Sequence, residues 1–133
     1  MKPYDDIAAE DYYEMGLEWM RAKNPEKARD CLIRCINLNP RFIYAYVTLA
    51  EVLAGTGDYG EAAQTLKKAS KLDPEFERLN FLQAKYRFKA GDYPGALKAI
   101  DRAIGAEPLP LYRKSREVIL KALHSQAKTR EKS

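Results

Sequence analysis

Two cysteines and one histidine are the side chains of this sequence best suited to nucleophilic or metal chemistry. Cys31 and Cys35 stand four residues apart in the segment CLIRC, and His124 lies near the C-terminal end. On a helix, residues four apart share one face and lie one turn from each other. A disulfide across that spacing would be strained, and two thiols are too few for a zinc site. We therefore interpret both cysteines as small packing residues.

No other group of residues predicts catalysis or a bound cofactor. Neither cysteine has a histidine partner nearby in the sequence, and a lone histidine on a helix is most often a surface or packing residue. The sequence contains no glycine-rich phosphate loop. The carboxylates follow the spacing of helix surfaces, which is typical of solvated faces rather than of an acid–base pair. We expect a protein that is not an enzyme and that uses neither a cofactor nor a metal.

The bulk composition indicates a folded domain outside the membrane. The chain has 133 residues, which is enough for one domain with a real core. Hydrophobic residues make up 46% and charged residues 32%, as in soluble folded proteins. No segment has the length of a transmembrane helix, and the acidic N-terminal segment lacks the apolar core of a secretory signal. These features predict a cytoplasmic protein.

The two ends of the chain carry opposite charge, although the net charge is only +4. Residues 1–18 hold one lysine and six carboxylates, whereas residues 109–133 hold seven lysines and arginines and two glutamates. Opposed ends favour specific charge pairing over a uniform nucleic-acid surface. The C-terminal cations also lack an accompanying aromatic platform. The sequence therefore argues against RNA or an acidic membrane as the partner.

A period of 34 residues organises most of the chain. Similar segments end at Pro40, Pro74 and Pro108. A fixed period in this range is typical of stacked repeats. The same step relates Asn24, Asp58 and Asp92; Ala28, Ala62 and Ala96; Leu32, Leu66 and Ile100; and Cys35, Ala69 and Ala103.

Each repeat is predicted to form two helices. In the second unit, residues 42–57 have helical periodicity that stops at Gly55 and Gly57, a signal of a helix end. Residues 58–72 follow as a second helix, with Asp58 placed to cap its first turn. Pro74 has no amide hydrogen and disfavours helix at the residue before it, so it closes the unit.

These residues resemble the tetratricopeptide repeat family, whose unit is a 34-residue helix–turn–helix. The resemblance covers about residues 9–108 and includes the turn pattern Gly-Asp-Tyr at 57–59 and 91–93. The family's small residue in the first helix of each unit matches Gly16, Ala50 and Ala84.

Two units depart from the family pattern. The first unit has Lys23 at the glycine position of the turn, although Pro25 suits a first helical position. The third unit places Gln83 and Arg87 where the second has leucines, so its first helix could be turned differently in the stack.

The resemblance implies an all-α fold, an α-solenoid that forms a right-handed superhelix from three units and a capping helix. The expected cap has a stripe of Leu111, Ser115, Val118 and Ala122, widened by Tyr112, Ile119 and Leu123, to cover the last repeat. We expect a single domain over residues 1–128, with repeat 1 at about 7–40, repeat 2 at about 41–74, repeat 3 at about 75–108, the cap at about 109–128 and a disordered basic tail at 129–133.

In this family, the first helix of each unit lines a concave groove that holds a peptide, so the resemblance also implies a binding surface. Its middle would be apolar, with carboxylates at one end and cations at the other, which suits a segment with apolar anchors and charges of both signs. The expected lining consists of Tyr13, Leu17, Met20, Tyr44, Val47, Thr48, Glu51, Arg78, Phe81, Lys85 and Phe88.

One subclass of the family grips the C-terminal carboxylate of heat-shock chaperones with lysine, asparagine and arginine side chains. A bare carboxylate needs several convergent donors, and only Arg78 has the required chemistry here. We therefore expect a different peptide or protein partner. At the five corresponding positions this chain has Tyr13, Leu17, Thr48, Arg78 and Leu82.

Three functions stay open from the sequence. The first is a protein-binding adaptor that holds a partner segment in its groove. The second is a self-assembling scaffold, a homo-oligomer in which the acidic first helix of one copy meets the basic capping helix of the next. The third is a secretion-type chaperone that holds an apolar segment of an effector.

Overall fold

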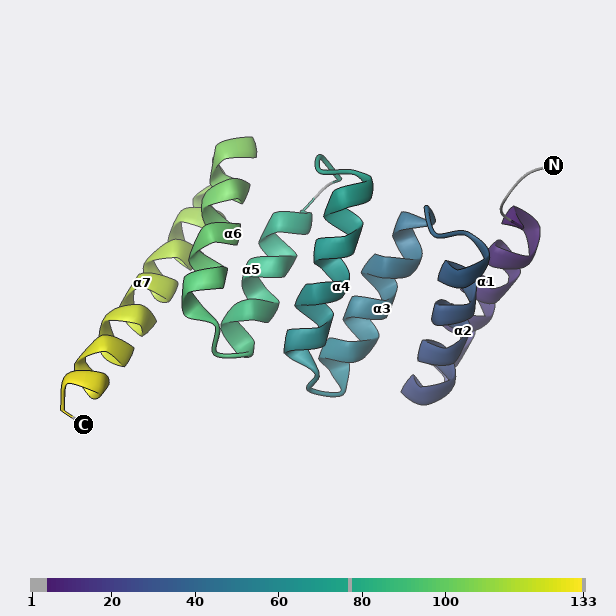
Figure 1. Ribbon diagram of the computed structural model, residues 1–133, viewed down its shortest axis with the longest axis horizontal. Coiled ribbons are helices and arrows are strands. Elements are labelled where there is room, and N and C mark those ends of the chain that lie inside the picture. Colours follow the sequence, from purple (N-terminus) through teal and green to yellow (C-terminus); the bar gives the residue numbers. More distant parts are fainter. Residues whose placement is uncertain (1–4, 77, 133) are drawn as a thin grey trace. The chain divides into compact units, whose positions relative to one another are not determined.

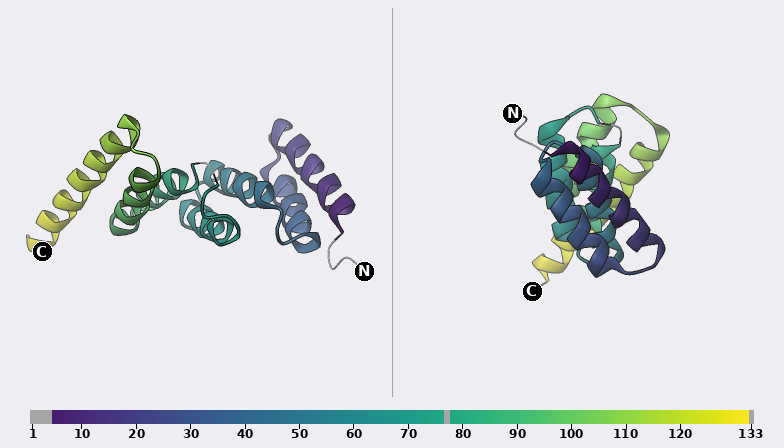
Figure 2. Two further views of the ribbon diagram at one scale, coloured as in Figure 1. Left: turned by 90° about the horizontal axis from the view of Figure 1, so that it is seen from above. Right: turned by 90° about the vertical axis from the view of Figure 1, so that its right-hand side faces the viewer.

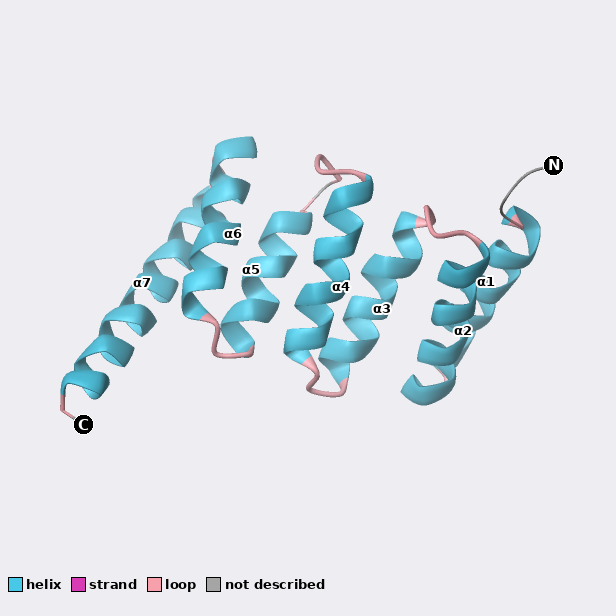
Figure 3. Ribbon diagram, viewed as in Figure 1, coloured by secondary structure: helices cyan, strands magenta, loops and turns pink. Residues whose placement is uncertain are grey.

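The protein is all-α over the residues that its computed structural model describes, which are 5–76 and 78–132 (Figure 1). Short loops join the helices, and those residues include no strand (Figure 3). The all-α prediction is confirmed. The helices are α1 Asp6–Arg21, α2 Pro25–Leu38, α3 Ile43–Gly55, α4 Tyr59–Leu72, α5 Leu79–Lys89, α6 Tyr93–Ala106 and α7 Pro110–Glu131.

Two compact units make up the chain, residues 1–75 (unit 1) and residues 76–133 (unit 2). In unit 1, α1 packs on α2, α2 on α3, and α3 on α4. In unit 2, α5 packs on α6, and α6 packs on α7, which runs in the opposite direction (Figures 1 and 2). One continuous domain over residues 1–128 stays a prediction.

The turn inside each repeat has the same handedness, although only two of the three turns contain glycine. Gly57 and Gly91 have φ angles of 87° and 84°, and Lys23 has a φ of 58°. This left-handed conformation is natural for glycine and costs energy for a residue with a Cβ atom. Lys23 therefore replaces the glycine of the family pattern but keeps the conformation of the turn. Pro25 begins α2, as predicted.

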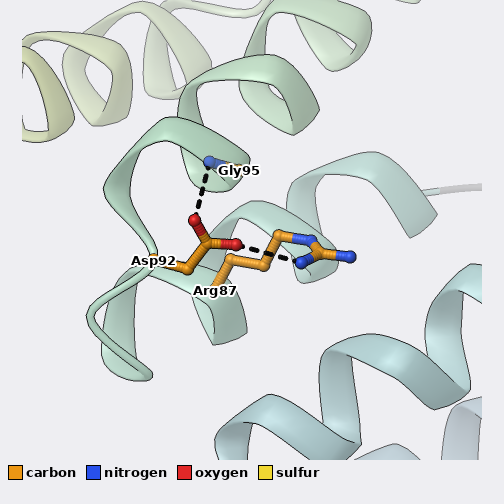
Figure 4. A network of polar contacts seen from close by, with 3 residues as sticks. All are labelled: Arg87, Asp92 and Gly95. Carbon is orange, nitrogen blue, oxygen red and sulfur yellow. Dashed lines mark hydrogen bonds and ion pairs between the residues drawn. The ribbon is translucent and has the colours of Figure 1, made fainter.

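Polar side chains cap two of the three second helices. The Asn24 side chain accepts a hydrogen bond from the Lys27 amide at 3.1 Å. At the start of α6, Asp92 Oδ1 accepts from the Gly95 amide at 3.0 Å, and Oδ2 lies 3.1 Å from Arg87 Nη1 (Figure 4). Such caps satisfy amides that the first helical turn leaves without partners.

The predicted cap at Asp58 is wrong in its chemistry. Asp58 does precede α4, but its side chain accepts no amide hydrogen bond from the first turn. Asp58 Oδ2 instead accepts from the Thr56 hydroxyl at 2.9 Å. The Thr56 hydroxyl oxygen also lies 3.0 Å from the Leu53 carbonyl oxygen, so this threonine links the Asp58 carboxylate to the end of α3, a local contact that the spacing alone did not reveal.

The periodic small and branched residues form the core, as their spacing predicts. Ala28, Ala62 and Ala96 are fully buried. So are Leu32, Leu66 and Ile100, which fill the space between paired helices. In unit 1 the approach is close at Gly16, where a Cβ atom would lie 3.0 Å from Leu32 Cγ.

The first helix of the third repeat buries positions that are also buried in its counterpart in the second. Each buried residue of α5 lies 34 positions after a buried residue of α3, so Gln83 takes the buried position of a leucine. Three buried residues of α3 have counterparts in α5 that are not buried, namely Tyr46 with Asn80, Thr48 with Leu82, and Leu53 with Arg87, which pairs with Asp92. The four matching pairs are Ala45 and Leu79, Leu49 and Gln83, Ala50 and Ala84, and Val52 and Tyr86.

The buried face of the capping helix differs from the predicted stripe. In α7 the buried residues are Tyr112 and Ile119, whereas Leu111 and Val118 are each 52% exposed. The Tyr112 ring stacks on Phe81 of α5 with 4.9 Å between centroids. Burial of the larger aromatic surface turns the helix so that the flank of the predicted stripe, and not its centre, covers the repeat.

The capping helix is also longer than predicted. It continues to Glu131, so residues 129–131 are helical and do not begin a disordered tail. No glycine or proline interrupts this end, and the Thr129 hydroxyl donates to the Ser125 carbonyl at 3.0 Å. Helix-forming residues without a breaker extend a helix past its last packed turn. Ser133 lies outside the described residues.

Candidate binding surfaces on the first helices

The predicted groove residues of unit 1 lie on α1 and α3 and differ in accessibility. Tyr44 is 58% exposed, and Glu51 is exposed as well. Thr48 is buried, with 7% of its surface exposed. The exposed side chains are accessible to a partner, whereas the buried Thr48 side chain is not. The half-buried members are Tyr13, Leu17, Met20 and Val47.

A polar contact joins the two helices that carry these residues. The hydroxyl oxygens of Tyr13 and Thr48 lie 3.2 Å apart, within hydrogen-bonding distance. The Tyr13 ring also packs against Phe42, with 5.0 Å between centroids. Phe42 was not among the predicted site residues, although its place just before α3 could have suggested it. These contacts fix the Tyr13 ring at the surface of unit 1.

Glu51 is the one carboxylate on this surface whose ionisation is clearly perturbed. Partial desolvation raises the pKa of Glu51 above its ordinary value. The shift means that the ionised carboxylate is less well solvated in the folded chain than in water. A cation from a partner at this position would relieve that penalty.

Unit 2 contains an open, mostly apolar pocket of about 180 Å³. Helices α5 and α7 form its walls, and Ile100 of α6 contributes to its lining. Three predicted site residues, Phe81, Lys85 and Phe88, line it. The residues from α7 were predicted to cover the last repeat and not to form a site. The full lining is Phe81, Ala84, Lys85, Phe88, Lys89, Ile100, Ser115, Val118 and Ile119.

Aromatic neighbours hold the two phenylalanines of this pocket in place. Phe81 stacks on Tyr112 of α7, and Phe88 lies 5.2 Å from Tyr93 in a tilted arrangement. Lys85 and Lys89 are exposed and add positive charge beside the apolar lining. The pocket thus combines fixed apolar walls with a basic edge.

Arg78 is the predicted site residue of unit 2 that does not line the pocket. It precedes α5 with a left-handed φ of 65°. Its guanidinium lies 5.3 Å from the centroid of the Phe81 ring, a cation–π distance. Arg78 therefore packs on the phenylalanine.

The two cysteines and the histidine lie in surroundings typical of packing or surface residues. Cys31 and Cys35 are buried, and burial raises the pKa of both thiols, that of Cys35 to about 11. Buried thiols of raised pKa are poor nucleophiles. His124 is exposed. Within residues 5–76 and 78–132, no three histidine, cysteine or carboxylate side chains gather as a metal site would require, and no helix is long and apolar enough to cross a membrane.

Known proteins share this repeat pattern in sequence. The family model for the tetratricopeptide repeat matches residues 13–75, 47–109 and 81–126. Over 120 residues the chain is 28% identical to the small glutamine-rich tetratricopeptide repeat-containing protein 2 of Mycosarcoma maydis. That alignment covers 90% of this chain and 32% of the relative. The chain thus spans about a third of that relative's length.

Solved structures share the fold. The first tetratricopeptide repeat domain of Spaghetti (RPAP3), bound to the HSP90 peptide SRMEEVD, has a TM-score of 0.77 and 18% identity, with 90% of this chain and 98% of that chain covered. The TPR2B domain of yeast Sti1, in a complex with pHsp70, has a TM-score of 0.73 and 23% identity, with 90% and 98% covered. At these identities the likeness shows the fold.

The solenoid-type fold expected from the 34-residue period is therefore confirmed. Three observations support the same repeat unit. They are the paired helices, the left-handed turn inside each pair, and a family model that matches most of the chain. The chain belongs to the tetratricopeptide repeat family.

Proposed function

We propose that the chain is a non-catalytic protein-interaction module that binds a peptide or protein segment, with an apolar side chain of the partner in the pocket of unit 2. The pocket itself carries the proposal, because it is open, apolar and lined by three of the predicted site residues. Two structural relatives were solved with chaperone peptides, which supports a peptide as the kind of ligand.

The pocket suits one anchoring side chain with acidic neighbours. Burial of a leucine or phenylalanine side chain contributes about 1.5–3 kcal/mol to binding. Phe81 and Phe88 are already packed against neighbouring rings, so little side-chain entropy is lost when a ligand arrives. Lys85 and Lys89 would attract carboxylates that flank the anchor, and salt would weaken that attraction.

The exposed side chains of α1 and α3 form the second contact surface in this proposal. Tyr44 offers an accessible aromatic ring, and Glu51 would gain from a cation on the partner. Tyrosine is well suited to such a role because it combines apolar area with a polar tip. The expected partner therefore presents both signs of charge.

We do not expect this chain to hold a bare C-terminal carboxylate as the chaperone-binding subclass does. The hydroxyls of Tyr13 and Thr48 lie within hydrogen-bonding distance of each other, so one O–H is engaged and one remains, fewer than the several donors that a bare carboxylate needs. Arg78 stacks on Phe81 and is the one cation at the five positions. The peptide SRMEEVD and its C-terminal amide should therefore bind with similar, low affinity in isothermal titration calorimetry.

Selection from a random peptide library on the full chain tests the proposal. Selected peptides, labelled with fluorescein, are titrated against wild type, Phe88→Ala and Ile33→Ala, with fluorescence anisotropy as the readout. Ile33 is 41% exposed on α2 and serves as a matched apolar truncation outside the pocket. We expect Phe88→Ala to weaken binding by about tenfold, as loss of an aromatic contact at an interface does.

The control variant distinguishes binding in the pocket from nonspecific hydrophobic binding elsewhere on the surface. Ile33→Ala should bind the selected peptides as wild type does, and circular dichroism should show equal helix content in all three proteins. If Phe88→Ala bound every selected peptide as tightly as Ile33→Ala, the pocket would not be the binding site and the proposal would fail.

A further inference from the structure

Helix α7 carries an apolar stripe that the other described elements cover only in part. We define the α7 stripe as Leu111, Ser115, Val118 and Ala122, and its two large members are each 52% exposed. Lys114 and Lys121 are exposed and follow Leu111 and Val118 by three residues. On a helix, residues three apart are surface neighbours, so a row of lysines flanks the stripe.

Helix α1 has an outer face of the opposite charge. Ala9 and Gly16 are the buried residues of α1. Helical periodicity places another set on the side of the helix away from them, and all its members are exposed. We define the α1 outer face as this set, Ile7, Asp11, Glu14 and Glu18. Ile7 is 78% exposed, the highest value among the large hydrophobic residues that the structure describes.

We propose that a second copy of this chain covers the α7 stripe, with the α1 outer face of one copy docked along the α7 stripe of the next. The α7 stripe shares Ser115 and Val118 with the lining of the pocket, but the variants that test the association change residues outside that lining. Helix α1 holds five carboxylates and one arginine, whereas α7 holds six lysines and arginines and two glutamates. Attraction between such surfaces supplies both orientation and rate of association.

The spacing of the residues also matches. Leu111 and Val118 are seven residues apart, as are Lys114 and Lys121. On α1, Asp11 and Glu18 have the same separation. A seven-residue repeat returns side chains to nearly the same face of a helix, so two helices that share it can repeat one contact along their length. Ile7 supplies an apolar residue to the contact from the α1 side.

The contact joins two different surfaces, so each copy keeps one α1 face and one α7 stripe available after a first association. Such heterologous contacts extend beyond dimers or close into rings. The structure thus predicts association that increases with protein concentration and decreases with salt, because salt screens charge pairs at the surface.

Sedimentation velocity of the full chain tests the proposal with two paired variants. The α1 variant is Ile7→Lys with Glu14→Lys, and the α7 variant is Leu111→Asp with Lys121→Asp. All four positions are exposed, so circular dichroism should show an unchanged fold. We expect wild type to associate in low salt and each variant alone to stay monomeric.

A mixture of the two variants provides the sharper result. The α1 variant keeps its α7 stripe and the α7 variant keeps its α1 face, so the equimolar mixture should associate again. A control with Ile33→Lys and Lys68→Glu, exposed positions on α2 and α4, should behave as wild type does. Phe88→Ala should also associate normally, because Phe88 lies on α5 and is not part of the α7 stripe.

Three results would overturn the proposal. These are a wild type that stays monomeric in low salt, variants that associate as wild type does, and a mixture that remains monomeric. Each result would leave the pocket proposal intact, because the peptide titration uses a different residue and a different readout. Conversely, loss of peptide binding in Phe88→Ala would not affect the expected sedimentation.

Discussion

Replacement of Gly16 by alanine tests the closest approach between α1 and α2. A Cβ atom there would lie 3.0 Å from Leu32 Cγ and 3.1 Å from Leu32 Cδ2. Leu32 is fully buried and has little room to move. Alanine gains about 1 kcal/mol of helix propensity over glycine, whereas overpacking a closed core costs about 1–3 kcal/mol. We expect Gly16→Ala to lower the free energy of unfolding by about 1 kcal/mol.

Urea unfolding followed by the fluorescence of Trp19 measures this free energy, because the only tryptophan lies on α1 itself. Gly60→Ala is the control, since a Cβ atom at Gly60 meets nothing within 4 Å. It should raise the free energy of unfolding by about 0.4–1 kcal/mol. In a Leu32→Ala background, Gly16→Ala should become stabilising as its methyl group enters the cavity. Equal stabilisation by Gly16→Ala and Gly60→Ala in the wild-type background would refute the argument.

Three further predictions concern turns, caps and pH. Lys23→Gly should raise the free energy of unfolding by about 0.5–1 kcal/mol in urea titrations, because it removes a left-handed residue with a Cβ atom. Asp92→Ala should lower the melting temperature and reduce the free energy of unfolding by about 1 kcal/mol, because it removes a helix cap. Asp58→Ala should reduce the free energy of unfolding by less, since the Asp58 side chain caps no amide. The raised pKa of Glu51 means that wild type loses stability as pH rises from below the unfolded-state pKa through the folded-state pKa. Glu51→Gln should therefore gain stability relative to wild type in thermal melts as the pH rises above the ordinary pKa of a glutamate. A stability difference between the two proteins that does not change with pH would contradict this prediction.

Much of the fold was predictable because its signals are local or periodic. A glycine or an aspartate at a fixed step marks a turn and a helix start whatever surrounds it, and alanines 34 residues apart predict a close helix contact. The sequence therefore predicted the helices, their pairing and the buried residues Ala62 and Leu66. The resemblance also predicted Phe81 and Phe88 as groove residues; both line the pocket of unit 2, and their role in binding stays a prediction.

Choices between two similar local arrangements depended on tertiary contacts. On α7, two neighbouring apolar stripes had comparable patterns, and the Phe81 ring selected the one that contains Tyr112. At Asp58, the carboxylate accepts from the Thr56 hydroxyl and not from an amide of the first turn of α4. Similarly, only the packed structure showed that Thr48 is buried against Tyr13.

The sequence by itself thus determined the repeat, its helices and the core positions, because each depends on residue type and on a fixed spacing along the chain. The tertiary structure decided which face of α7 stays exposed, which predicted groove residues a partner could reach, and where a pocket opens beside Phe88. These properties depend on which side chains become buried when helices pack together. Burial is set by the shape and size of residues on helices that are distant in sequence.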